Sequence, residues 1–335
     1  MRVVYVAHSL IAERQRLFGA ELRRQLERDG GELMEVYPSR WNHLEREGGF
    51  DVSFPGDIIA FRFPVAAWMA VKWFKPDVLL VQQEAYSGTA WDAMVIAEET
   101  GAKLVLFSWE NAVRPSDQAE VVLGKAAARV YGNQDAFQFG EAVLKSGITR
   151  ILPQVGLDPE IFMPCVEVEQ RFDVLFCGRK GDPMKGERVL DAAVAGQGWR
   201  VGKAHELGFV AYGDLAARYS SAIVQCVPSL DVPGRAREQF APAVTVEGFL
   251  CGLPVVTTDQ VAIQEWTSDC PVLWRASQGN VNELRLGIMD ALSYARDDPV
   301  RWMKLREGLR RWAMLKFSNK AVALEYVALF REVLA

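Results

Sequence analysis

The sequence is poor in the residues that build metal centres and disulfide frameworks, with five cysteines and three histidines among 335 residues. The cysteines are odd in number, lie far apart and form no Cys-x-x-Cys pair, which argues against a disulfide framework and a zinc site. Reduced, mostly buried thiols in a cytoplasmic protein are expected instead. His43 and His205 lie in polar stretches and are expected at the surface, not as ligands.

Long apolar runs and an excess of charge are absent as well. No stretch approaches the roughly 18 uncharged apolar residues of a membrane-spanning helix. The N-terminus predicts a β-strand and not a signal peptide, because it lacks a charged segment before a long apolar one and a small-residue cleavage site. With 38 basic and 43 acidic residues the net charge is −5, which disfavours binding of a polyanion through bulk charge and leaves a local basic patch open.

Several catalytic motifs are missing. G-x-S-x-G, H-E-x-x-H and G-x-x-x-x-G-K-[ST] do not occur, which argues against hydrolase, zinc-protease and P-loop chemistry. Nicotinamide chemistry is disfavoured because no G-x-G-x-x-G follows the first strand.

The sequence does contain a regular alternation of short β-rich runs with longer helical patterns. Half of the residues are hydrophobic, and the length corresponds to about two domains of roughly 150 residues. The alternation predicts βαβ units and parallel sheets, and therefore an α/β fold. Turns bearing glycine and proline over residues 151–164 place the junction between a first domain, 1–153, and a second, 154–317. The last helix, about 318–335, is expected to cross back onto the first domain.

The most informative segment runs from Cys177 to Gly186, directly after an apolar strand. A glycine-rich turn at the C-terminal end of a parallel strand, opening into a helix, presents backbone N–H groups and the positive helix end to an anion. Arg179 and Lys185 add two cations at the edge where open α/β sheets bind ligands. The segment predicts a phosphate or diphosphate site, with a plain turn carrying two solvated cations as the alternative.

A second segment, residues 237–257, holds a pair of carboxylates, Glu238 and Glu247. An ionised carboxylate only accepts hydrogen bonds and therefore suits the vicinal hydroxyl groups of a sugar. The alternative for Glu247 is a cap at the start of a helix.

Together these motifs resemble the donor site of retaining family 4 glycosyltransferases with the GT-B fold. The resemblance runs from about Arg150 to the C-terminus and is looser before Arg150. Four motifs carry it: Gly178-Arg179 with Lys185-Gly186, Glu238-Gln239-Phe240 with Glu247, Gly252-Leu253-Pro254-Val255-Val256, and Val155-Gly156-Leu157-Asp158-Pro159 with Phe162 and Pro164. It implies two Rossmann-like domains facing across a cleft, with the acceptor on the first, the donor on the second, and the C-terminal helix crossing back to the N-terminal domain.

The implied activity is transfer of a sugar, of the hexosyl type, from a nucleotide-diphosphate sugar to a hydroxyl of a carbohydrate, lipid-linked or other acceptor. The anomeric configuration would be retained with no cofactor and no metal, in agreement with the lack of an Asp-x-Asp triplet. Arg179 and Lys185 would contact the diphosphate, Glu238 the sugar and Glu247 the ribose. The implied donor-binding residues are Gly178, Arg179, Lys185, Gln239, Phe240, Ala241 and Glu247.

The donor segment departs from the family pattern at one place. Glu238 and Glu247 are separated by one residue more than in the family, which we interpret as an insertion around Ala241-Pro242, and Pro242 offers no backbone N–H. A catalytically impaired relative that binds nucleotide sugars or carbohydrates is therefore an alternative. A hydrolase or epimerase of the same fold is disfavoured by the few histidines near strand ends. A DNA-modifying transferase would need a basic, aromatic-edged groove that the charge count does not show.

In the first domain, polar residues follow three strands. His8 and Glu84 come after two of them, and Trp109, Glu110 and Asn111 come where many relatives carry a histidine facing the acceptor. Glu110 is the catalytic candidate here, and the other four are candidates for binding the acceptor. A structural hydrogen-bonding role is the alternative for each.

Two further stretches suggest a peripheral contact with an anionic inner membrane surface. Residues 62–75 combine tryptophan and phenylalanine with cations, as an interfacial helix does, and the first helix has a basic polar face. The cations of that face are Arg14, Arg16, Arg23, Arg24 and Arg28. The alternative is a packing helix whose lysines extend to solvent.

Overall fold

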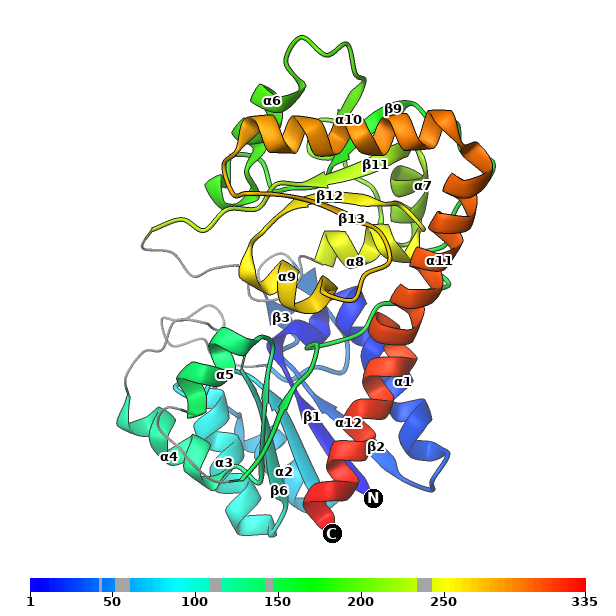
Figure 1. The fold of residues 1–335 in the computed structure, drawn as a ribbon. Coiled ribbons are helices and arrows are strands. Elements are labelled where there is room, and N and C mark those ends of the chain that lie inside the picture. Colours follow the sequence, from blue (N-terminus) through cyan, green and yellow to red (C-terminus); the bar gives the residue numbers. More distant parts are fainter. Residues whose placement is uncertain (42–43, 52–60, 109–115, 142–146, 234–242) are drawn as a thin grey trace. The chain divides into compact units, whose positions relative to one another are not determined.

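The structure, a computed structural model, describes residues 1–41, 44–51, 61–108, 116–141, 147–233 and 243–335 (Figure 1). The chain forms two compact units. Unit 1 consists of Met1–Gly156 together with Asn319–Ala335, and unit 2 consists of Leu157–Ser318.

Unit 1 is built on a parallel sheet with the strand order β2-β1-β5-β6-β7-β8. Its strands are β1 (Arg2–Val6), β2 (Glu32–Val36), β5 (Val78–Gln82), β6 (Lys103–Ser108), β7 (Ala128–Tyr131) and β8 (Ile148–Ile151). Strand β5 is buried along its whole length, as expected for a parallel strand covered on both faces. A short antiparallel pair, β3 (Arg40–Trp41) and β4 (Leu44–Glu45), lies outside this sheet.

Helices cover both faces of the unit 1 sheet. Val3 and Tyr5 of β1 belong to the core beneath α1 (Glu13–Glu27) and α12 (Asn319–Leu334). Val4 and Val6 belong to the core beneath α2 (Val65–Phe74) and α3 (Gly88–Thr100), because successive side chains of a strand point to opposite faces. The remaining helices of this unit are α4 (Asp117–Lys125) and α5 (Gln134–Glu141). The basic helix α1 and the aromatic helix α2 therefore cover opposite faces of the sheet and do not form one surface.

Unit 2 repeats this architecture with the strand order β10-β9-β11-β12-β13, again all parallel. Its strands are β9 (Phe172–Phe176), β10 (Val201–Lys203), β11 (Ala222–Val227), β12 (Val255–Thr258) and β13 (Leu273–Ala276). Its helices are α6 (Glu187–Val194), α7 (Leu215–Ser220), α8 (Ala243–Leu250), α9 (Val261–Thr267), α10 (Val281–Asp297) and α11 (Pro299–Phe317). Helices α6 and α10 share a core with Val224 and Cys226 of β11, whereas Gln225 between them donates a hydrogen bond to the Val244 carbonyl of α8 on the other face (Figure 1).

The chain leaves unit 1 and returns to it at neighbouring points. Helix α11 ends at Phe317, Ser318 is extended, and α12 begins at Asn319. The Leu157 N–H donates to the Phe317 carbonyl at 2.9 Å, so the outgoing and returning segments lie side by side. Helix α12 then buries Tyr326 and its neighbours in the core of unit 1.

The α/β class, the parallel sheets and the crossing C-terminal helix are thus confirmed. None of the described helices is long and apolar enough to cross a membrane.

Candidate functional site

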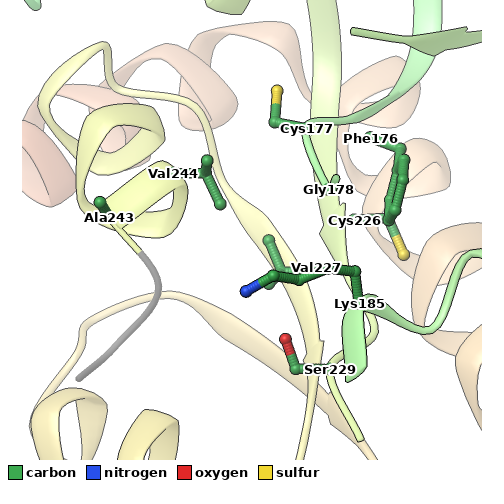
Figure 2. Close-up of a pocket in the computed structure, with 9 residues that line it drawn as sticks. All are labelled: Phe176, Cys177, Gly178, Lys185, Cys226, Val227, Ser229, Ala243 and Val244. Carbon is green, nitrogen blue, oxygen red and sulfur yellow. The ribbon is translucent and has the colours of Figure 1, made fainter. Parts of the chain in front are cut away.

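A cavity lies at the carboxyl edge of the unit 2 sheet, between the loops after β9 and β11 and the first turn of α8 (Figure 2). Its volume is about 190 Å³. Its lining consists of Phe176, Cys177, Gly178, Lys185, Cys226, Val227, Ser229, Ala243 and Val244. Open parallel sheets bind ligands at this edge, where helix starts present unpaired N–H groups. This volume is below the roughly 300–1,000 Å³ that is typical of small-molecule sites.

Two glycines allow the loop after β9 to pack directly against Pro228, which follows β11, and against the Phe176 ring. Gly186 has φ +65°, and a Cβ there would lie 1.8 Å from the Pro228 carbonyl oxygen at the end of β11. A Cβ on Gly178 would lie 2.2 Å from the ring of Phe176. The close approach therefore requires glycine at both positions, and it fixes the loop that carries Lys185.

The two cations predicted at this edge lie differently. Lys185 ends a short 3-10 helix, Pro183–Lys185, and its side chain extends into the cavity between Ser229 and the start of α8 (Figure 2). The Arg179 side chain is 81% exposed, lies 3.7 Å from the Asp182 carboxylate and does not line the cavity. Lys185, and not Arg179, brings positive charge into the described cavity.

Helix α8 contributes both its start and a carboxylate. Ala243 and Val244 line the cavity, and Glu247 follows them by three to four residues, which places it on the same helix face. The Glu247 side chain is buried, and its Oε2 accepts a hydrogen bond of 2.5 Å from the Tyr219 hydroxyl. Glu247 is thus held beside the cavity by Tyr219 and is not a cap at the start of a helix.

Burial keeps the groups around Glu247 protonated. Desolvation, reinforced by the charge of Glu247, raises the pKa of the Cys177 thiol to about 12. The pKa of Tyr219 lies well above its ordinary value, first because of burial and then because of Cys177 and Glu247. Tyr219 therefore remains a hydrogen-bond donor to the Glu247 carboxylate at neutral pH.

Tyr219 and Ser229 are site residues that the sequence interpretation missed. Ser229 is the second residue after β11, so the rule that ligands bind beyond strand ends could have found it. Tyr219 lies near the end of α7, before β11, and no spacing rule connects it with Glu247.

The remaining predicted donor residues, Glu238, Gln239, Phe240 and Ala241, lie outside the described residues, as does Pro242. Their roles, and the effect of the extra residue between the two glutamates, stay predictions.

In unit 1, two of the predicted residues lie at the carboxyl edge of the sheet. Strands β1 and β5 are parallel neighbours, so the residues that follow them meet: the Gln83 side-chain amide donates to Nδ1 of His8. The His8 ring also lies 4.5 Å from the Trp41 ring, centroid to centroid. Glu84 follows Gln83 and is 5% exposed. Gln83 was not among the predicted residues, although it directly follows β5, the strand that also precedes Glu84.

The other predicted residues of the first domain, Trp109, Glu110 and Asn111, lie outside the described part of the chain. Their assignment stays a prediction.

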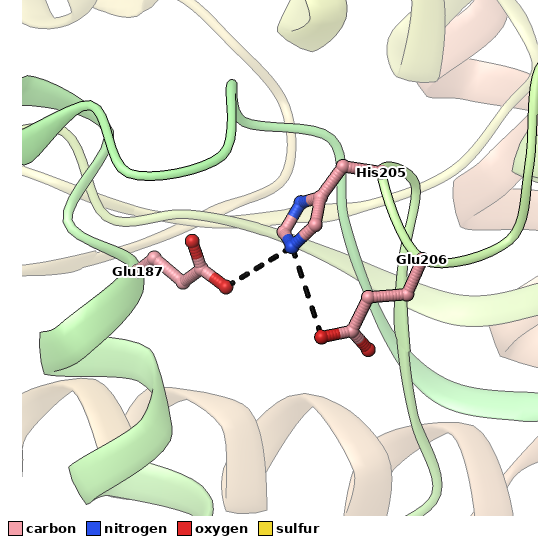
Figure 3. Close-up of side chains that lie close together, drawn as sticks. All are labelled: Glu187, His205 and Glu206. Atoms are coloured by element: carbon pink, nitrogen blue, oxygen red, sulfur yellow. Dashed lines mark ion pairs between the residues drawn. The ribbon is translucent and has the colours of Figure 1, made fainter.

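One cluster of unit 2 has the composition of a metal site. Oxygens of Glu187 and Glu206 lie 3.3 Å and 3.7 Å from Nε2 of His205 (Figure 3). The same Glu187 oxygen lies 2.9 Å from the Lys203 ammonium, which lowers the pKa of Glu187. A divalent ion would have to displace this ammonium, so the geometry fits an ion-pair network better than a cation site.

The comparisons with known proteins concern the fold. No family model matches the chain, and no curated protein does. Among solved structures, the chain is similar to a sucrose-phosphate synthase from Thermosynechococcus elongatus, with 16% identity, a TM-score of 0.71 and 99% of each chain covered. It is also similar to HepE from Anabaena in complex with UDP and glucose, with 14% identity, a TM-score of 0.68 and coverage of 99% of this chain and 100% of that one. A third is an alpha-glucosyltransferase in complex with UDP and a 13-mer DNA, with 11% identity, a TM-score of 0.63 and 99% of each chain covered. At such identities the likeness shows the fold alone: over its whole length the chain has the GT-B fold of two Rossmann-like domains.

Proposed function

We propose that the protein is a glycosyltransferase that moves a sugar from a nucleotide-diphosphate sugar to an acceptor hydroxyl. One observation carries the proposal: Lys185, the backbone at Gly178 and the start of α8 converge on one cavity at the carboxyl edge of the unit 2 sheet. Support comes from the fold shared with a protein described as a glycosyltransferase, with an alpha-glucosyltransferase solved with UDP, and with HepE, which was solved with UDP-glucose.

The donor is proposed to bind with its diphosphate beside Lys185. A diphosphate is a compact dianion or trianion, and an ammonium, loop N–H groups and a helix start are the groups that bind such an anion. The exposed Arg179 lies three residues after the end of β9, in the same loop as Lys185, and would reach the diphosphate from the solvent side.

The chemistry proposed at this site is electrostatic. As the glycosidic bond breaks, negative charge grows on the leaving diphosphate, so a cation placed there in advance stabilises the transition state more than the ground state. Retention of configuration and independence of metal ions are part of the proposal, and they follow from the motif resemblance.

Glu247 is proposed to accept hydrogen bonds from the two ribose hydroxyls of the donor. Tyr219 holds one oxygen of this carboxylate at 2.5 Å, so it is a positioning residue that limits how Glu247 can turn. Glu238 is proposed to approach the sugar itself.

The acceptor is proposed to bind at the carboxyl edge of the unit 1 sheet. His8, Gln83 and Glu84 gather neutral hydrogen-bonding groups and a carboxyl group there, which suits a hydroxyl nucleophile better than an anion. Glu110 is the proposed catalytic group of this unit.

Helix α2 alone supports the peripheral membrane contact. Val65, Met69 and Trp73 recur along one side of α2 and are 77%, 66% and 87% exposed, and Lys72 lies beside them. If Trp73→Ser does not reduce co-sedimentation with vesicles containing an anionic phospholipid, this part of the proposal is wrong.

A thermal-shift panel of UDP, GDP, ADP and TDP, free and as sugar conjugates, tests the donor site. A ligand at 100 times its Kd should stabilise the protein by about 2.7 kcal/mol. Lys185→Ala should lose most of this shift, and Lys180→Ala should keep it, because Lys180 is an exposed lysine of the same loop that does not line the cavity. If no nucleotide shifts the wild-type protein, the donor site is wrongly assigned.

A catalytically impaired relative is the second candidate, favoured by the extra residue between Glu238 and Glu247 and by Pro242. Slow hydrolysis of the nucleotide sugar that binds best separates the two candidates. Tight binding without any hydrolysis or transfer would identify the impaired relative.

The likeness to the alpha-glucosyltransferase solved with DNA makes DNA an acceptor to include in the same transfer assay. The net charge of −5 argues against it, since binding to a polyanion draws on many cations.

A further inference from the structure

Unit 2 contains a second cavity that shares no lining residue with the first. Its volume is about 360 Å³, within the roughly 300–1,000 Å³ range of small-molecule sites. It lies between the segment that follows Met163, the end of α7, the turn after α8, and one face of α11. Its lining consists of Pro164, Cys165, Val166, Val168, Gln170, Ser220, Gly252, Met303, Arg306, Glu307 and Arg310.

The wall along α11 is fixed by backbone contacts. Gly252 has φ +63°, and a Cβ there would lie 3.1 Å from the Arg306 carbonyl oxygen, so α11 approaches this turn closely. In return, Nε of Arg306 donates to the Gly252 carbonyl at 2.7 Å. The Arg306 guanidinium therefore has a defined place at the cavity wall.

Two arginines of this wall differ in how many partners they have. The guanidinium of Arg310 donates to three backbone carbonyls, those of Pro159, Phe162 and Leu250, and both of its terminal nitrogens hold the chain. Arg306 makes only its Nε bond to Gly252 within the part of the chain that the structure describes. Its two terminal nitrogens are thus available to a ligand in the cavity.

The charge of Arg306 is also unbalanced. Among the described residues no carboxylate pairs with it, and the neighbouring Glu307 lies 3.9 Å from Arg311. Burial lowers the pKa of Arg306, which reflects the cost of holding a cation partly out of water. A bound anion would offset that cost.

The rest of the wall is mostly apolar. Pro164, Val166, Val168 and Met303 line the cavity, whereas the acidic residues between and after the valines, Glu167 and Glu169, do not. An occupant that pairs with Arg306 therefore meets hydrocarbon over much of its remaining surface.

We propose that this second cavity binds a small monocarboxylate with an apolar body. The carboxylate pairs with the two terminal nitrogens of Arg306, since the planar guanidinium matches a carboxylate in a two-point contact. The apolar body lies against the valines and Met303. One available guanidinium, with Glu307 also in the lining, suits a single negative charge better than a polyphosphate.

Cys165 supplies a reporter inside the cavity. Its thiol is free and lines the cavity, whereas Cys270 belongs to the same unit but not to the lining. We would measure the rate at which iodoacetamide alkylates each cysteine by peptide mass spectrometry, with octanoate and benzoate as probes. Saturating probe is expected to slow alkylation of Cys165 by about threefold or more and to leave Cys270 unchanged.

Charge selectivity is tested with octan-1-ol and benzyl alcohol, which have the same apolar bodies without the carboxylate. They should protect Cys165 at concentrations about tenfold higher than the acids, since a hydrogen-bonded charge contact is worth about that factor in affinity. Acetate, which has the charge and little apolar surface, should not protect.

Two variants test the role of Arg306. Arg306→Gln should weaken protection by the acids about tenfold, and Arg301→Gln, an exposed arginine of the same helix, should not change it. Because Arg306 also holds Gly252, Met303→Glu serves as a second test: this side chain is 51% exposed, so the fold should tolerate the change while the new charge repels the acids. The proposal is overturned if neither acid slows alkylation, if acids and alcohols protect equally, or if both Arg306→Gln and Met303→Glu keep wild-type protection.

Discussion

The carboxyl edges of the two sheets have the same architecture and different chemistry. In unit 2 the loop after β9 contains Gly178, Gly181 and Gly186, carries the cations Arg179, Lys180 and Lys185, and leaves backbone close to a cavity that Lys185 lines. In unit 1 the loop after β1, residues 7–12, has no glycine and no cation, and its histidine is buried against Gln83 and Trp41. One edge exposes backbone and positive charge, and the other gathers packed hydrogen-bonding groups together with the buried carboxyl group of Glu84.

This difference explains how two similar folds can take different parts of one reaction. A parallel sheet always brings strand ends and helix starts to one edge, and the loop residues decide what that edge attracts. Glycine and lysine make an anion site, whereas histidine and glutamine offer directional contacts to a neutral hydroxyl. The donor role of unit 2 and the acceptor role of unit 1 are proposed on this contrast.

The largest effect on this contrast is expected from removing the Lys185 ammonium, the cation that lines the unit 2 cavity. Lys185→Ala should lower kcat/KM for sugar transfer about 100-fold to 1,000-fold, as loss of one charge-stabilising group at a leaving group does. Lys180→Ala in the same loop should stay within about twofold of wild type, since it does not line the cavity. Initial rates of transfer at several donor concentrations give kcat/KM for each of the two variants. Equal rates for the two variants would mean that the cavity is not the diphosphate site.

The glycine-rich loop can be tested through stability. Gly186 and Gly181 have nearly the same φ, +65° and +70°, but a Cβ on Gly186 would strike the Pro228 carbonyl, whereas Gly181 has nothing within 4 Å. Gly181→Ala should therefore cost about 1 kcal/mol of unfolding free energy from backbone strain alone. Gly186→Ala should cost about 2–4 kcal/mol, because the clash adds to the strain. Urea unfolding of both variants checks this, and equal losses would show that the two loops are not in close contact.

The edge of unit 1 is tested by separating acceptor turnover from donor binding. His8→Ala should lower transfer to the acceptor about tenfold, because one directional contact is lost there. The Kd for the nucleotide should remain within twofold of wild type, since His8 belongs to unit 1. Transfer assays and calorimetric titration with the nucleotide provide the pair of values. A weaker nucleotide Kd with unchanged turnover would reverse the proposed roles of the two units.

A smaller effect is expected at the positioning residue of unit 2. Tyr219→Phe removes the hydroxyl that donates to Glu247 and should weaken nucleotide binding about fivefold. Tyr294→Phe is the matched control, because Tyr294 lies on α10 and does not contact Glu247. A 2′,3′-dideoxyribose analogue of the nucleotide, which lacks both hydroxyls, should bind equally well to Tyr219→Phe and wild type if Glu247 acts through the ribose hydroxyls. If Tyr219→Phe still binds the analogue about fivefold more weakly than wild type does, the role of Tyr219 is purely structural.

Much of this fold could be predicted from local pattern. The apolar runs ending at Val6, Gln82 and Phe176 are strands because buried parallel strands are apolar along their length. Strands β7, β8 and β13 were not predicted: each has four residues, and the charged residues Arg129, Arg150 and Arg275 interrupt their apolar pattern. Arg129 is buried because its guanidinium pairs with Glu141, a tertiary contact that no local pattern contains.

The site was less accessible to sequence reasoning. The glycine and lysine positions after β9 follow from a local motif, and the structure brings Gly178 and Lys185 to one cavity. The Tyr219–Glu247 and His8–Gln83 contacts join residues 28 and 75 positions apart, and only the sheet topology brings such residues together. The anion proposed for the second cavity depends on which arginine of α11 keeps its terminal nitrogens unbonded within the described residues, and composition cannot distinguish Arg306 from Arg310.

Metal removal is expected to have the smallest effect, and it tests whether unit 2 relies on its own cations. Dialysis against EDTA should leave sugar transfer within about twofold of the untreated protein, because Lys185 supplies charge to the leaving diphosphate. The cluster of Glu187, His205 and Glu206 should not change this, since the Lys203 ammonium already lies 2.9 Å from Glu187. Lys203→Ala tests this cluster directly, because it removes the cation that competes with a metal ion. Any divalent ion that the cluster can hold should then bind and raise the temperature midpoint of unfolding. Loss of wild-type activity in EDTA, restored by Mg²⁺ or Mn²⁺, would mean that the charge on the diphosphate is balanced by an ion and not by the loop after β9.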